Sequence, residues 1–108
     1  MQITQPIVYP FSLESLPSFM QTHVEVLDVF ILKRLMVAIR SDCDEAVLFV
    51  IKNTDNVAKI VRSDYTMKLV YLKESFISRE QYEYAQLADK YLRKHLAQVL
   101  IEETKYRE

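Results

Sequence analysis

The chain has 108 residues, of which half are hydrophobic and 27% are charged; its net charge is −1 and it contains no glycine. This length predicts one domain over residues 1–108, and the apolar content is too high for a disordered chain. The lack of glycine excludes a P-loop, a dinucleotide-binding fingerprint and a G-x-S-x-G nucleophile elbow, because each needs a backbone position without a Cβ atom.

The N-terminal third predicts an arm followed by two helices. Residues 1–11 contain two prolines, which exclude a helix, so we expect an extended arm there. Residues 12–22 have apolar side chains at helical spacing. Residues 22–25 match the capping box T-x-x-E, after which a second helix is predicted through about Lys33. Residues 34–40 fit either a helix or a strand, because they are rich in aliphatic side chains.

The middle of the chain predicts a small antiparallel sheet of about three strands. Turns are indicated by polar residues at 41–44 and 53–56. Ala46–Ile51 is an uninterrupted apolar run, typical of a buried strand, and residues 57–62 fit a short strand or a single helical turn. Thr66–Lys73 is predicted to be a strand, because its large apolar residues alternate with others.

The strongest local signal is a long amphipathic helix over residues 78–105. Ser78 to Gln81 match the capping box S-x-x-Q, and no helix breaker follows. At 1.5 Å per residue this helix is about as long as a compact domain of this size is wide. Its apolar surface is covered either by a partner or by the two N-terminal helices. The expected fold is thus α+β, with a body at 12–77.

No pattern in the sequence predicts catalysis, a cofactor or a metal. The residues considered are an acidic cluster around the single cysteine and the two histidines: Asp42, Cys43, Asp44, Glu45, His23 and His95. They lack the ligand spacing of a calcium loop or of a zinc site. Negative charge around Cys43 also disfavours the thiolate that an enzyme built on it would need. We therefore predict a protein that is not an enzyme.

The single cysteine and the first residues bear on the cellular compartment. An intramolecular disulfide is impossible, which favours a reducing compartment. The first residues do not resemble a signal peptide, and the apolar runs at 35–39 and 46–51 are too short to cross a bilayer. We expect a cytoplasmic protein with no membrane partner.

These observations favour a protein–protein interaction module, such as a small adaptor, inhibitor or regulatory subunit. The expected partner is a second copy of the chain, joined as a homodimer through the C-terminal helix, or another protein. The expected mechanism is burial of the tyrosine- and leucine-rich surface of this helix, with charges at the rim that determine the choice of partner. The residues predicted to contact the partner are Tyr84, Leu87, Tyr91 and His95.

A nucleic-acid-binding regulator is the alternative. Residues 46–79 hold six basic and three acidic side chains, with tyrosines among them, and aromatic rings between cations can stack bases and hold phosphates. In segment 52–79 the residues expected to contact an anionic ligand are Lys59, Arg62, Lys68 and Lys73. The charges on the exposed face of a sheet would give the same pattern, and the near-neutral net charge argues against this alternative.

Overall fold

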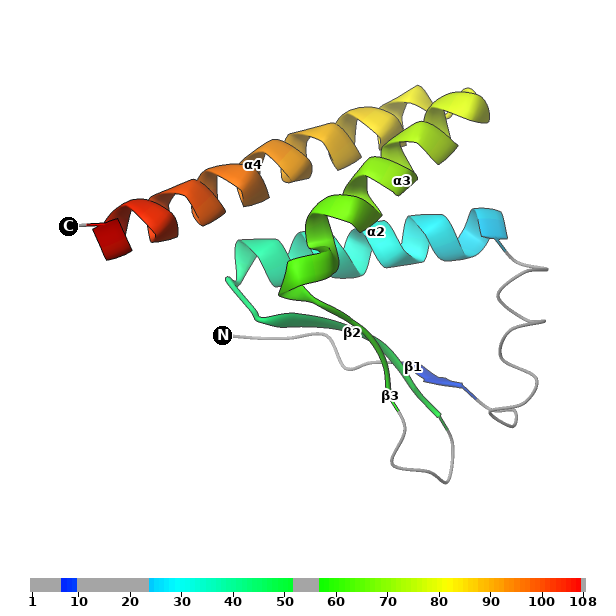
Figure 1. Cartoon of the computed structure of the whole chain (residues 1–108). Coiled ribbons are helices and arrows are strands. Elements are labelled where there is room, and N and C mark those ends of the chain that lie inside the picture. Colours follow the sequence, from blue (N-terminus) through cyan, green and yellow to red (C-terminus); the bar gives the residue numbers. More distant parts are fainter. Residues whose placement is uncertain (1–6, 10–23, 52–56, 108) are drawn as a thin grey trace. The chain divides into compact units, whose positions relative to one another are not determined.

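The computed structural model of this protein describes residues 7–9, 24–51 and 57–107 (Figure 1). Helices and strands are both present, which confirms the expected mixture of α and β structure. The chain divides into two compact units, residues 1–62 and 63–108, and each is described by itself. The single domain stays a prediction.

Some predicted elements lie outside the described residues. These are the helix over 12–22, the turn over 53–56, Thr22 of the first capping box, and most of the arm over 1–11. The part of the arm that is described, Ile7–Tyr9, forms a strand, β1.

The first unit contains a three-stranded sheet in the order β1-β2-β3. The predicted buried strand is confirmed as β2 (Glu45–Ile51), and of the two alternatives for residues 57–62 the strand is right, as β3 (Val57–Val61). β2 and β3 are antiparallel, but β1 runs parallel to β2. The purely antiparallel sheet was therefore a wrong prediction. A helix lies between β1 and β2 in the chain, and a strand–helix–strand connection joins parallel neighbours.

A β-bulge interrupts the pairing of β2 with β3. The register shifts between Val47 and Phe49, which makes Leu48 the extra residue. Beside the bulge, Arg34 Nε donates a hydrogen bond to the Val47 carbonyl oxygen at 2.7 Å. The helix that carries Arg34 thereby supplies a donor where the regular ladder is broken, which satisfies a backbone acceptor.

That helix is α2 (Val24–Arg40), which packs on β2 (Figure 1). The ambiguous residues 34–40 are helical. Buried apolar residues recur every three or four positions from the first turns to the last, and this period outweighs the strand propensity of the aliphatic side chains. The residues on this buried stripe include Leu27, Ile31, Leu35 and Ala38.

α2 ends in a Schellman motif, in which one residue after the helix is left-handed. The Asp42 N–H donates to the Ile39 carbonyl at 3.2 Å, and the Cys43 N–H donates to the Ala38 carbonyl at 2.8 Å. Asp42 has φ 54°, a conformation that usually selects glycine. The turn predicted over residues 41–44 is confirmed, and an aspartate fills its left-handed position.

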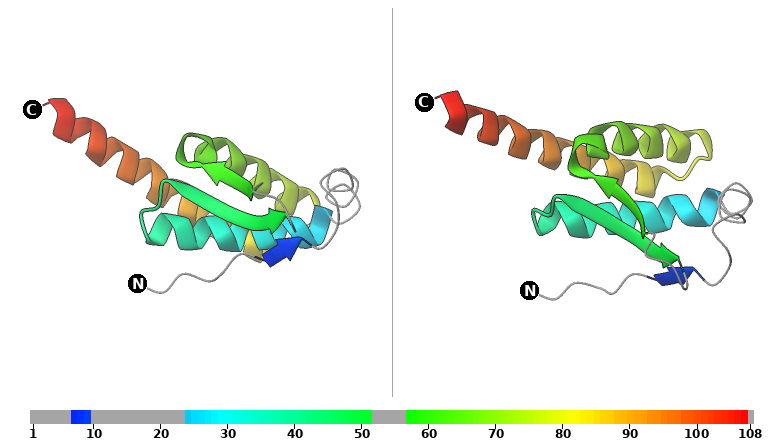
Figure 2. Two further views of the ribbon diagram at one scale, coloured as in Figure 1. Left: turned by 90° about the horizontal axis from the view of Figure 1, so that it is seen from below. Right: turned by 60° about the horizontal axis from the view of Figure 1, so that its bottom comes forward.

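The second unit is a helical hairpin. A 3-10 turn, η2 (Arg62–Asp64), begins at the last residue of the first unit and leads into α3 (Tyr65–Ser78), after which α4 (Tyr82–Arg107) follows (Figure 2). The predicted strand over Thr66–Lys73 is wrong, because this segment belongs to α3. The residues that α3 buries are spaced by three or four positions: Tyr65, Leu69, Leu72 and Phe76.

The alternation that suggested a strand shares only one residue with the buried stripe of α3. Leu69 is buried in the helix, whereas Met67 is 70% exposed and Tyr71 is 48% exposed. Residues two positions apart share a face in a strand but diverge in a helix. The packing of α3 against α4 therefore selects the helical stripe.

The turn between α3 and α4 also differs from the prediction. Ser78 ends α3 instead of capping α4, and its hydroxyl donates to the Ser75 carbonyl at 2.8 Å. Glu80 has φ 59°, its N–H donates to the Ile77 carbonyl, and the following N–H, of Gln81, donates to the Phe76 carbonyl. This is a second Schellman motif without glycine. The long C-terminal helix is confirmed, with its start at Tyr82.

We expect Glu80→Gly to raise the free energy of unfolding by about 0.5–1 kcal/mol. A left-handed conformation costs an L-residue about 1–2 kcal/mol, of which glycine's greater freedom in the unfolded chain offsets a part. The matched control is Asp42→Gly, where the same backbone relief is opposed by loss of the 2.9 Å contact between Asp42 and Arg62. Urea denaturation of both variants measures the difference. A loss of stability in Glu80→Gly would contradict the prediction.

Candidate functional site

The register of the α3–α4 hairpin leaves the end of α4 without a neighbour in α3. The Phe76 and Tyr84 ring centroids are 5.3 Å apart near the turn, and those of Tyr65 and His95 are 5.3 Å apart at the other end. Tyr65 is the first residue of α3. Because the helices are antiparallel, the part of α4 after His95 extends beyond α3, as both views of Figure 2 show.

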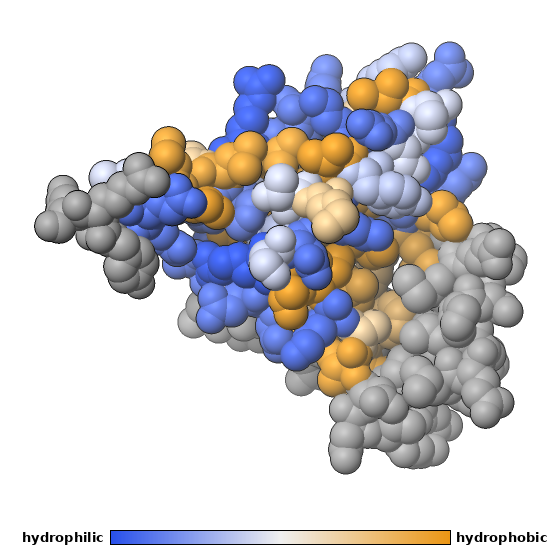
Figure 3. Space-filling model, in the orientation of Figure 1, coloured by the Kyte–Doolittle hydropathy of each residue, from blue (hydrophilic) through white to orange (hydrophobic). Residues whose placement is uncertain are grey.

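We call residues 96–107 the α4 overhang. It is roughly 18 Å long at 1.5 Å per residue. Three large apolar side chains on it face solvent: Leu96 is 47% exposed, Leu100 64% and Ile101 59%. Figure 3 shows apolar residues along the projecting C-terminal part of α4. Exposed apolar residues are common singly, but here Leu96 and Leu100 share one face and Ile101 adjoins Leu100 about 100° around the helix, a grouping of the kind that marks an interaction site.

Two charged residues continue this face of α4 on either side of the leucines. Arg93 lies one turn before Leu96 and Glu103 lies one turn after Leu100, and both are exposed. Arg93 Nε is 3.0 Å from Asp89 Oδ2, yet the Arg93 side chain remains 79% exposed. The apolar patch thus has a basic end and an acidic end.

The four residues predicted to contact a partner lie in the hairpin part of α4, before the overhang. Tyr91 and His95 are buried, and Tyr84 and Leu87 are half-buried. The Tyr84 and His95 rings contact aromatic rings of α3. Their role in partner binding stays a prediction.

The exposed residues Leu96, Leu100 and Ile101 are not among the four predicted contacts. The signal that would have located them is the difference in length between α3 and α4. The assignment of Thr66–Lys73 to a strand concealed it.

A groove of about 270 Å³ lies between α3 and α4 near the hairpin turn, lined by Lys73, Ile77, Tyr82, Ala85, Gln86 and Asp89. Lys73 Nζ donates to Asp89 Oδ1 at 2.9 Å. This hydrogen bond lowers the pKa of Asp89; desolvation opposes it, and the charges of Arg93 and Lys73 add to the lowering. Asp89 therefore stays ionised and paired near neutral pH, which suits a structural contact better than proton transfer.

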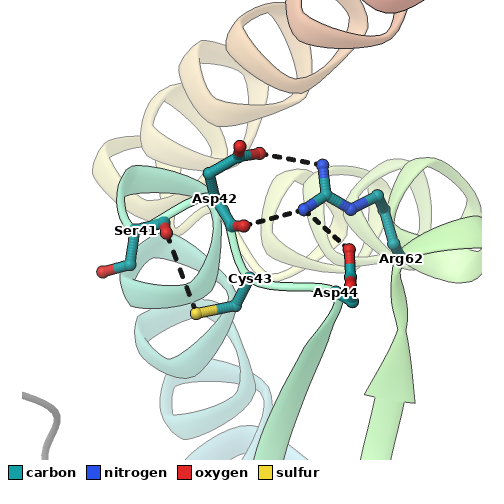
Figure 4. A network of polar contacts seen from close by, with 5 residues as sticks. All are labelled: Ser41, Asp42, Cys43, Asp44 and Arg62. Carbon is teal, nitrogen blue, oxygen red and sulfur yellow. Dashed lines mark hydrogen bonds and ion pairs between the residues drawn. The ribbon is translucent and has the colours of Figure 1, made fainter.

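The acidic turn after α2 is held together by Arg62 (Figure 4). Arg62 Nη1 donates to Asp42 Oδ1 at 2.9 Å, and Nη2 donates to the Asp42 carbonyl oxygen at 2.9 Å and lies 3.1 Å from Asp44 Oδ1. The Cys43 Sγ lies 3.9 Å from the Ser41 carbonyl oxygen. We call the contacts of Arg62 with Asp42 and Asp44 the turn clasp. Its geometry supports a structural role.

No group of three residues that could hold a metal ion occurs in the described part of the chain. Glu45, the remaining acid of the cluster, pairs with Lys59 at 2.9 Å. His23 lies outside the described residues. The absence of a metal site stays a prediction for the whole chain.

Three of the four residues expected to contact an anionic ligand pair with carboxylates instead. Lys59 pairs with Glu45, Arg62 pairs with Asp42 and Asp44, and Lys73 pairs with Asp89. The fourth, Lys68, lies with Nζ 4.7 Å from the Tyr71 ring centroid. A phosphate would have to compete with a carboxylate at three of these positions. Nucleic-acid binding stays a prediction, and this geometry does not favour it.

Comparison of the chain with protein-family models, with curated proteins and with solved structures returned no match. Within the residues that the structure describes, no helix has the length and apolar character needed to span a membrane.

Proposed function

We propose that this protein is a non-enzymatic protein–protein interaction module that binds its partner through the α4 overhang. The observation that carries the proposal is the exposure of Leu96, Leu100 and Ile101, which lie past Tyr65, the first residue of the antiparallel helix α3. A small adaptor, inhibitor or regulatory subunit in the cytoplasm would work in this way. Its single cysteine, Cys43, suits that reducing compartment.

The energetics of the overhang support binding as its role. Complete burial of a leucine or isoleucine side chain is worth roughly 1.5–3 kcal/mol, and about half of that remains available at each of these three positions. Burial of apolar surface is a main driving force of protein association, so these three side chains can contribute to the affinity for a partner. The exposed parts of these side chains contribute little to folding, so their substitution is expected to change association more than stability.

A photo-crosslinking residue in place of Ile101 tests the proposal. A matched control places the same residue at Glu83, which is exposed in the first turn of α4. In cells that express the protein, we expect a discrete covalent adduct from position 101 and none from position 83. The adduct should disappear when Leu96→Asp and Leu100→Asp are added.

Mass spectrometry of the adduct identifies the partner, and denaturation of the Leu96→Asp/Leu100→Asp variant checks that the fold is retained. Surface substitutions usually change stability by no more than about 0.5 kcal/mol. The absence of an adduct at position 101, or equal adducts at both positions, would overturn the proposed function.

A further inference from the structure

One exposed face of α4, which runs from Arg93 into the overhang, has a basic residue at one end and an acidic residue at the matching position of the other end. Arg93, Leu96, Leu100 and Glu103 are separated by three, four and three residues and therefore lie on one face of α4. Reversal of their order about Gln98 exchanges the two leucines and replaces the basic residue by the acidic one. A surface with this property is complementary to itself when a second copy is turned end over end.

Two-fold symmetric interfaces require this relation. When residue i contacts residue j of the partner copy, residue j must also contact residue i of the partner. We propose, as a refinement that rests on the proposed function, that the occupant of the α4 overhang is a second copy of this chain. The two α4 helices pair antiparallel, and the two-fold axis crosses them at the level of Gln98 along the helix, on the face that carries Leu96 and Leu100.

In this arrangement Leu96 packs against Leu100 of the second copy, and Arg93 pairs with Glu103 of the second copy. Each contact occurs twice because of the symmetry. A parallel pairing would place Arg93 beside Arg93 and Glu103 beside Glu103, and like charges face to face disfavour it. Charge therefore selects both the partner and its direction.

The size of the paired region sets the expected affinity. Arg93 and Glu103 are roughly 15 Å apart along the helix axis at 1.5 Å per residue. Two helices in contact over this length bury less than the roughly 1,200 Å² of the smallest standard interfaces. We therefore expect a reversible dimer in the micromolar range. The exposure of Arg93 leaves its guanidinium accessible to the partner although Asp89 is nearby.

Charge reversal on the full-length protein tests this arrangement. We expect wild type to dimerise with rising concentration in sedimentation equilibrium. Arg93→Glu alone and Glu103→Arg alone should each weaken the dimer at least about tenfold, because like charges then meet twice. The double variant should recover the dimer. An equimolar mixture of the two single variants should also recover it, as a heterodimer.

Matched controls apply the same charge changes to the neighbouring residues. Lys94→Glu and Glu102→Arg reverse charge at adjacent positions that lie on a different side of the helix. We expect both variants to dimerise like wild type. If the controls weaken the dimer as much as Arg93→Glu does, the proposed pairing is wrong.

Other outcomes separate this inference from the proposed function. A wild-type protein that stays monomeric, while position 101 cross-links to a different protein, overturns the second copy as occupant and leaves the interaction module intact. A dimer that is insensitive to both charge reversals also overturns the antiparallel pairing. A monomer with no adduct at position 101 overturns both proposals.

Discussion

Phe76→Ala is expected to lower the free energy of unfolding by about 3–5 kcal/mol. Phe76 is fully buried in the α3–α4 hairpin, and its ring lies 5.3 Å from the Tyr84 ring, centroid to centroid. The Arg79 guanidinium lies 5.8 Å from the same ring. Removal of the phenyl ring takes away these contacts and leaves a cavity that two helices joined by a short turn can fill only in part.

Urea denaturation followed by far-UV circular dichroism measures this loss, since the chain has no tryptophan for fluorescence. Phe76→Leu keeps most of the volume and should cost less than about 1.5 kcal/mol. Met67→Ala, on the exposed side of the same helix, should cost no more than about 0.5 kcal/mol. Equal losses in Phe76→Ala and Met67→Ala would contradict the packing of the hairpin.

The misassignment of α3 shows why part of this fold could not be predicted from local pattern. The segment from Thr66 to Lys73 satisfies the period of a strand through Met67, Leu69 and Tyr71, and the period of a helix through Leu69 and Leu72. Both patterns are present in the sequence. Only the face that contacts α4 decides between them, and that contact is made with residues distant in the chain. β2 and α4 have one dominant pattern each, and both were predicted correctly.

The candidate site could not be located from the sequence for the same reason. The apolar stripe of α4 is evident in the sequence, but the sequence does not show how far along this stripe α3 reaches. The boundary at His95 separates buried Tyr91 from exposed Leu96 and Leu100. It follows from the length of α3, so an error in α3 moves the expected interface by one or two turns along α4.

The left-handed turn positions were predictable in one case and not in the other. Aspartate is tolerated in this conformation, so the turn at Asp42 follows from the cluster of polar residues around it. Glutamate has no such preference, and the match of Ser78 to Gln81 with a capping box pointed to a helix start at that place. Glu80 is left-handed because the short hairpin demands a reversal there.

Arg62→Ala is expected to lower the free energy of unfolding by about 1–2 kcal/mol. The Arg62 side chain is only 21% exposed and joins the turn after α2 to the end of β3. Its carboxylate partners are mostly exposed, and exposed ion pairs contribute little. The bond from Nη2 to the Asp42 carbonyl is the larger contribution, because this charged donor fixes the left-handed residue that ends α2.

Three further variants measured by the same denaturation experiment separate these contributions. Asp44→Asn removes one exposed carboxylate and should cost less than about 0.5 kcal/mol. Lys59→Ala, which breaks the exposed pair with Glu45, should cost a similar amount. Arg62→Lys keeps the charge but cannot present two donors in a planar fork, so it should lose most of what Arg62→Ala loses. If Arg62→Lys were as stable as wild type, charge alone would hold the turn clasp, and the bond to the Asp42 carbonyl would not be its main support.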